Sequence, residues 1–131
     1  MRLIDSSSLC KYVNREEGWE RVKEELLKGC FSLDLALKEV GNSLWKRFRR
    51  GELDEALALN AFKAFLEFLP IAILDEREVF EDALRLALKH DLTLYDSLFI
   101  ARAIKDKAIF ITSDKKQAEA AEPEGIEVIL I

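Results

Sequence analysis

Short apolar segments that alternate with longer stretches of helical periodicity restrict the fold of this chain more than any other feature. Segments compatible with buried strands lie at residues 2–4, 31–33, 71–74, 108–112 and 127–131. Helical patterns occupy residues 34–50, 53–69, 76–89 and 95–104, and the last of these is apolar on almost every side. Because parallel strands need a covering crossover between them, this alternation predicts an α/β fold of three layers, α/β/α, with a central, mainly parallel five-stranded sheet.

The size and composition fit a soluble globular protein with one core. The chain has 131 residues, of which 50% are hydrophobic and 34% charged, and it contains no linker, repeat or low-complexity segment. We therefore expect a single domain over residues 1–131. The first residues lack the long apolar stretch of a signal peptide or a membrane span, so we expect a cytoplasmic protein. Cys10 and Cys30 are too few for a disulfide framework and are expected to be reduced thiols.

The charge balance argues against nucleic-acid binding through an overall positive potential, because the net charge is −5. The basic residues are nevertheless grouped. One cluster consists of Lys46, Arg47, Arg49 and Arg50, and a second group in the last third of the chain comprises Arg102, Lys105, Lys107, Lys115 and Lys116. The first cluster also has a structural explanation, because the helix dipole favours solvent-exposed basic residues at the C-terminal end of a helix.

Four acidic residues occupy the places where functional groups gather in such a sheet. Asp5 directly follows the first strand and Asp114 follows the fourth, at the carboxyl ends where ligands bind in open α/β sheets. Glu39 lies about one turn into the helix after the second strand, and Asp96 opens the buried helix that precedes the fourth strand. We expect the four carboxylates to converge on one crevice.

Each acid also has an ordinary structural interpretation. Asp5 and Asp114 could cap the helices that follow them, and Thr93 with Asp96 resembles a capping box. Glu39 could be a solvated helix residue, although the residue one turn further on is not basic.

Electrostatic repulsion favours a metal site over these separate interpretations if the acids do converge. Two carboxylates roughly 5 Å apart repel by about 3 kcal/mol at an effective dielectric constant near 20, so four together need a compensating cation. Oxygen ligands without accompanying His or Cys select Mg²⁺ or Mn²⁺, and the chemistry such a site supports is phosphodiester hydrolysis.

Other catalytic classes lack the residues they need. His90 is the only histidine, which excludes a metal-free ribonuclease with paired imidazoles, and we expect it to be a surface residue at a helix end. The sequence has neither a glycine-rich phosphate-binding loop nor a G-x-S-x-G elbow, so kinase-like and esterase-like functions are not supported.

Four ordered motifs carry a resemblance to a known family. The segments LIDSS at residues 3–7, LKEVGN at 37–42, LTLYDSL at 92–98 and TSD at 112–114 resemble the acidic motifs of PIN-domain nucleases. The similarity spans nearly the whole chain, and its most specific parts are Tyr95-Asp96 and the Thr two places before the last Asp. Size and the helical insert between the second and third strands look most like VapC-type toxins of toxin–antitoxin pairs.

The resemblance implies an endoribonuclease that uses Mg²⁺ or Mn²⁺, a homodimer, and a small VapB-like antitoxin partner whose tail covers the acidic groove. Carried onto this sequence, the metal-holding catalytic acids are Asp5, Glu39, Asp96 and Asp114. Ser7 and Thr112 match supporting hydroxyl positions. Asn42 is a softer candidate, for which a helix-surface role stays open, and Asp91 stands where a glycine is common.

The basic stripe beyond Glu39 suggests how RNA is held. Lys46 and Arg50 follow Glu39 at helical spacing and are predicted to bind the RNA backbone. Trp45 is expected in the core or in a dimer interface rather than as a base-stacking platform.

Three alternatives remain at this point. The first is an RNA-processing PIN endonuclease without an antitoxin, and the second is a catalytically silent module that binds RNA or protein. Retention of four acids argues against the silent module, because a site without metal would gain by losing their repulsion. A receiver-type or phosphatase-type domain is more distant, since Ser7 occupies the position where the phosphatase pattern needs a second acid.

Overall fold

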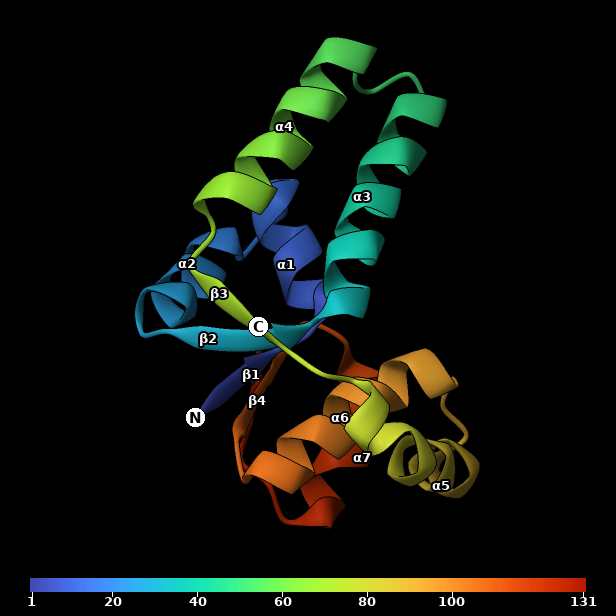
Figure 1. Ribbon diagram of the computed structural model, residues 1–131. Coiled ribbons are helices and arrows are strands. Elements are labelled where there is room, and N and C mark those ends of the chain that lie inside the picture. The colour runs from blue at the N-terminus through green and yellow to red at the C-terminus, as the bar shows by residue number, and fades with distance from the viewer.

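A five-stranded parallel sheet forms the centre of the computed structural model, which describes all 131 residues (Figure 1). The strands are β1 (Arg2–Ile4), β2 (Cys30–Leu33), β3 (Ile71–Leu74), β4 (Ile109–Thr112) and β5 (Val128–Leu130). They lie in the order β3-β2-β1-β4-β5, and each neighbouring pair is parallel. The predicted fold class is confirmed. β1 is the central strand, and the strand order reverses between β1 and β4.

Seven α-helices cover the two faces of this sheet. One face carries α1 (Ser6–Val13), α2 (Trp19–Leu27), α3 (Asp34–Arg49) and α4 (Glu55–Phe68), as Figure 1 shows. The other carries α5 (Phe80–His90), α6 (Leu94–Asp106) and α7 (Lys115–Ala121). Two short 3-10 helices, η1 (Arg77–Val79) and η2 (Glu122–Glu124), precede α5 and β5. No helix combines the length and the apolar character that crossing a bilayer requires.

The helices differ from the sequence prediction in two places. The predicted helix at residues 76–89 is divided into η1 and α5, and α2 was not predicted. Asp91, which stands where a glycine is common, ends α5 in the left-handed conformation with φ +53°. Glycine adopts this conformation without strain, which explains why the motif commonly has glycine at this place.

The core is centred on the two middle strands. Leu3, Ile4, Phe110 and Ile111 are fully buried, and they belong to one continuous cluster of 23 buried hydrophobic residues. The predicted burial of α6 is confirmed for Ser97–Ala103, which are all buried.

The hairpin of α3 and α4 extends away from the sheet (Figure 1). Trp45 on α3 is 55% exposed, so the expectation that it lies in the core is wrong. Only Phe65 of α4 is buried, although α4 is rich in apolar residues. The helices that leave the sheet therefore expose hydrophobic side chains that the core cannot cover.

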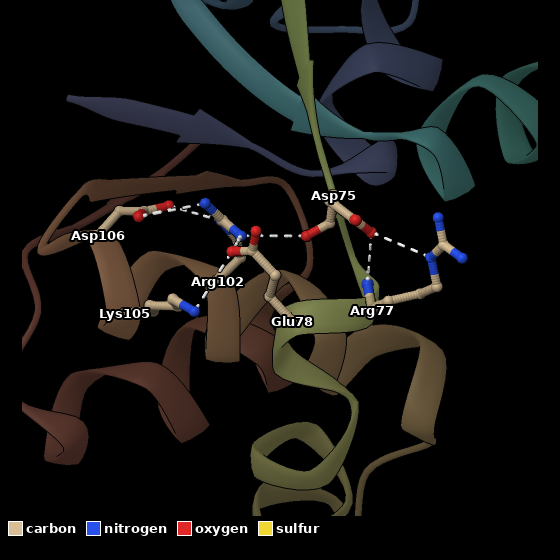
Figure 2. A network of polar contacts seen from close by, with 6 residues as sticks. All are labelled: Asp75, Arg77, Glu78, Arg102, Lys105 and Asp106. Atoms are coloured by element: carbon tan, nitrogen blue, oxygen red, sulfur yellow. Dashed lines mark hydrogen bonds and ion pairs between the residues drawn. The ribbon is translucent and has the colours of Figure 1, made fainter.

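A network of polar contacts attaches α6 to the segment that follows β3 (Figure 2). Arg102 of α6 is only 8% exposed, and its Nη1 donates to Glu78 Oε2 at 2.7 Å and to the Asp75 carbonyl at 3.0 Å. Its Nε donates to Asp106 Oδ2 at 2.6 Å. Lys105 reaches the same Glu78 carboxylate from the surface at 3.3 Å. Arg102 is therefore the buried connection between these two parts of the fold.

We expect Arg102→Met to lower the free energy of unfolding by about 2 kcal/mol, because it removes charge-assisted hydrogen bonds and leaves the Asp106 carboxylate without its partner. Lys105→Met, which removes only an exposed cation from the same network, should leave stability nearly unchanged. Urea unfolding of both variants measures the difference. If the two variants lowered the free energy of unfolding equally, the burial of Arg102 would not contribute to stability.

Candidate metal centre

Asp5 occupies the position directly after the central strand, where its carboxylate is fully buried. It caps α1 by accepting a hydrogen bond from the Ser8 backbone N–H at 3.1 Å. The Ser7 hydroxyl lies 2.7 and 2.9 Å from its two oxygens, and the Thr112 hydroxyl donates to Oδ2 at 2.6 Å. The two hydroxyl residues named from the sequence thus lie directly against the most buried acid.

The same hydroxyl groups connect the ends of β1 and β4. The Ser7 oxygen accepts from the Ser113 N–H at 2.9 Å, and the Thr112 oxygen accepts from the Asp114 N–H at 3.0 Å. These contacts follow from the parallel register that pairs Ile4 with Ile111, which brings the two strand ends to one edge of the sheet. Asp5 and Asp114 are therefore held relative to each other.

Helix capping does not use all of the carboxylate oxygens of Asp114 and Asp96. Asp114 caps α7 through Oδ1, which accepts from the N–H groups of Lys116 at 2.8 Å and Gln117 at 3.1 Å. The capping interpretation of Asp114 is correct, but it uses only one carboxylate oxygen. At Asp96 the cap is Thr93, whose hydroxyl accepts from the Asp96 N–H at 3.1 Å and also lowers the pKa of the Asp96 carboxyl, against the rise caused by burial.

Glu39 does not fit the alternative of a solvated helix residue. Its side chain is half-buried, and its Oε1 atom is buried without any hydrogen-bond partner. Burial raises the pKa of Glu39, while the nearby Ser6 hydroxyl and the charge of Lys46 oppose this rise. A buried carboxylate oxygen without a donor is costly unless a cation or a bound molecule satisfies it.

The four carboxylates are linked in pairs, because the charge of one raises the pKa of the next. Burial raises the pKa of Asp5 to about 6, and the charge of Asp114 adds to this rise. Burial also raises the pKa of Asp96, again with a contribution from Asp114, and the charge of Asp96 raises the pKa of Glu39. The structure thus brings all four predicted acids within electrostatic range, although they come from four separate segments of the chain.

These residues fit a hard divalent cation, with water completing its ligands. No group of three or more His, Cys, Asp or Glu side chains lies close enough together to hold a metal ion by itself. Mg²⁺, however, is usually held by one or two carboxylates together with several waters, so a closed cage is not required. The unpartnered Glu39 Oε1, the raised pKa of Asp5 and the absence of nitrogen and sulfur ligands all favour such an ion.

The other residues named from the sequence lie further from the acids. Asn42 is exposed on α3, one turn after Glu39. The charge of Lys46 acts on Glu39, whereas Arg50 lies beyond the end of α3 and pairs with Glu52 at 2.5 Å. Arg50 is therefore directed toward the loop after α3.

His90 differs from its prediction. It ends α5 as expected, but its side chain is only 15% exposed and lies 3.1 Å from Glu124. It is therefore a partner in an interaction across the fold rather than a surface residue.

Sequence reasoning missed three polar residues at the site. Ser6 lies beside Glu39, the Ser8 hydroxyl is 2.9 Å from that of Ser113, and the charge of Lys116 acts on Asp96. The signal for the serines was the run of three hydroxyl residues directly after a buried strand, since such residues at a strand end are close to any site there.

Comparison with known proteins identifies the family. The family model described as PIN domain matches residues 2–123. The chain belongs to the PIN-domain family. It is 36% identical over 120 residues to Ribonuclease VapC3 of Pyrobaculum aerophilum, covering 89% of this chain and 92% of that protein. The resemblance seen in the four acidic motifs is confirmed.

Solved structures share the fold along nearly the whole chain. The crystal structure of PAE2754 from Pyrobaculum aerophilum matches with a TM-score of 0.73 at 26% identity, covering 97% of this chain and 89% of that one. VapBC2 from Rickettsia felis, crystallised bound to a DNA fragment from its promoter, matches with a TM-score of 0.69 at 15% identity, covering 99% and 98%. The second similarity concerns the fold alone.

We expect Asp5 to make the metal-free protein less stable as pH rises. Because the pKa of Asp5 is about 6 in the folded protein and 3.8 ordinarily, the unfolded chain loses its proton first, and stability falls between these two values. The difference in unfolding free energy between Asp5→Asn and the wild type should therefore grow by roughly 2 kcal/mol from pH 4 to pH 7.

Chemical denaturation in EDTA at several pH values measures this difference, and the Asp5→Asn comparison cancels the contributions of the other titrating groups. Adding Mg²⁺ at pH 7 should reduce the difference, because a bound cation compensates the buried charge of the wild type. If the difference in unfolding free energy did not change with pH, the pKa of Asp5 would not be raised by burial, and the prediction would be wrong.

Proposed function

We propose that this chain is a cytoplasmic endoribonuclease that depends on Mg²⁺ or Mn²⁺ and serves as the toxin of a toxin–antitoxin pair. The observation that carries the proposal is the mutual effect of the four carboxylates on their pKa values, together with the unpartnered oxygen of Glu39. The relative at 36% identity bears the name of a ribonuclease, which supports RNA as the substrate.

The residues divide into those that would hold the metal and those that orient them. Asp5, Glu39, Asp96 and Asp114 would hold the ion, which when bound supplies an activated water and charge neutralisation at the scissile phosphate. Ser7 and Thr112 fix the direction of both Asp5 oxygens through hydrogen bonds. Glu39 Oε1 receives no hydrogen bond, so it would be free to contact the ion.

The exposed apolar surface of α3 and α4 supports a protein partner. Trp45 is 55% exposed, Phe48 46% and Leu59 61%, and these three side chains line a hollow between the two helices. An apolar surface of this kind is stabilised when another chain covers it. The neighbour from Rickettsia felis was solved as a VapBC complex, which supports a small antitoxin as the partner; a homodimer also remains part of the proposal.

The proposed activity predicts RNA cleavage that requires a divalent metal. The purified chain, freed of any partner, should cut mixed structured and single-stranded RNAs in Mg²⁺ or Mn²⁺ but not in EDTA. Asp96→Asn should reduce the cleavage rate by more than about a hundredfold, since loss of even a partner of a metal ligand costs 10- to 100-fold. Gel analysis of end-labelled RNA measures the rate.

The matched control is Asp34→Asn, which removes an exposed carboxylate at the start of α3 and should leave the rate unchanged. Cleavage that persists in EDTA would contradict the metal-dependent mechanism. Absence of both cleavage and calorimetric metal binding would instead favour a catalytically silent interaction module. A neighbouring gene for a short antitoxin distinguishes the toxin from an RNA-processing endonuclease.

A further inference from the structure

Two lysines approach the acidic site from opposite layers of the fold. Lys46 belongs to α3, and its charge acts on Glu39. Lys116 belongs to α7 in the other layer, and its charge acts on Asp96 (Figure 1). The two lysines therefore act on two neighbouring acids, Glu39 and Asp96, from the two helical layers that flank the sheet.

Both ammonium groups are free to bind a ligand. Neither Lys46 nor Lys116 forms an ion pair, and both side chains are exposed. Three other basic residues are engaged in ion pairs: Arg47 and Arg50 with Glu52, and Lys105 with Glu78. A lysine that stays near carboxylates without pairing with one is suited to a mobile anionic ligand.

The backbone fixes Lys116 to the site. Its N–H donates to Asp114 Oδ1 at 2.8 Å, so its Cα cannot move without disturbing the cap of α7. Lys115, one residue earlier, is also exposed and unpaired, but its charge does not contribute to the pKa shifts of Asp5, Glu39 or Asp96. Of this adjacent pair, only Lys116 acts on Asp96.

We propose that Lys46 and Lys116 bind the RNA phosphates on the two sides of the scissile one, so that the strand crosses the acids from the α3 layer to the α7 layer. The inference rests on the proposed nuclease function and adds Lys116 as a substrate-binding residue. It also explains how a chain of net charge −5 attracts a polyanion, since the positive charge is placed only where the backbone enters and leaves the site.

Equilibrium binding of a labelled single-stranded RNA tests the proposal without relying on cleavage. The measurement uses Ca²⁺ in place of Mg²⁺, several salt concentrations and a gel check that the RNA stays intact. Lys116→Ala should weaken binding to all sequences alike and reduce the slope of log K against log salt by about 0.7, the value for one lost contact with a single strand. Lys115→Ala is the control and should keep the wild-type slope.

A neutral methylphosphonate placed at single positions along the same RNA then locates each contact. The effect of Lys116→Ala should disappear when the phosphate on one side of the cut is neutral, and that of Lys46→Ala when the phosphate on the other side is neutral. Identical behaviour of Lys116→Ala and Lys115→Ala would overturn the inference while leaving the nuclease intact. Failure of the wild type to bind or cut RNA would instead overturn the proposed function.

Discussion

The burial of one charged group, the carboxylate of Asp5, is the constraint on which the rest of the site depends. Asp5 follows the central strand of the sheet, where Leu3 and Ile4 have no exposed surface, so the next side chain also lies out of water. Hydrogen bonds from three donors, the Ser7 and Thr112 hydroxyls and the Ser8 N–H, compensate part of the cost, yet the pKa still rises to about 6. A bound cation is the simplest way to compensate the remainder.

The parallel fold places the other acids around this one. Asp114 ends the neighbouring strand, while Glu39 and Asp96 come from helices on opposite faces of the sheet (Figure 1). Because the four acids come from separate segments of the chain, a displacement of α3 or α6 would move Glu39 or Asp96 away from the other acids. The buried contacts of Arg102, which attach α6 to the segment after β3, therefore matter for Asp96 although they lie at the other end of that helix.

Local pattern was sufficient to predict the strands and the positions of Asp5 and Asp114 directly after β1 and β4, because strand ends are marked by abrupt changes from apolar to polar residues. The pattern failed where the exposure of a side chain depends on residues that are distant in the sequence. Trp45 is exposed because the α3–α4 hairpin leaves the sheet, and His90 is covered because Glu124 lies beside it in space but 34 residues away in sequence. α2 was not predicted because only Val22 and Leu26 among its apolar residues are buried, which is too few to give a clear period.

The central claim is that the four carboxylates form one metal centre. Anomalous scattering from crystals grown with Mn²⁺ tests it most directly, because the signal locates the ion independently of any activity. We expect one or two strong anomalous peaks among Asp5, Glu39, Asp96 and Asp114. In crystals of Asp114→Asn we expect this signal to be lost. Well-ordered crystals with no peak at these carboxylates, or with Mn²⁺ only elsewhere on the surface, would contradict it.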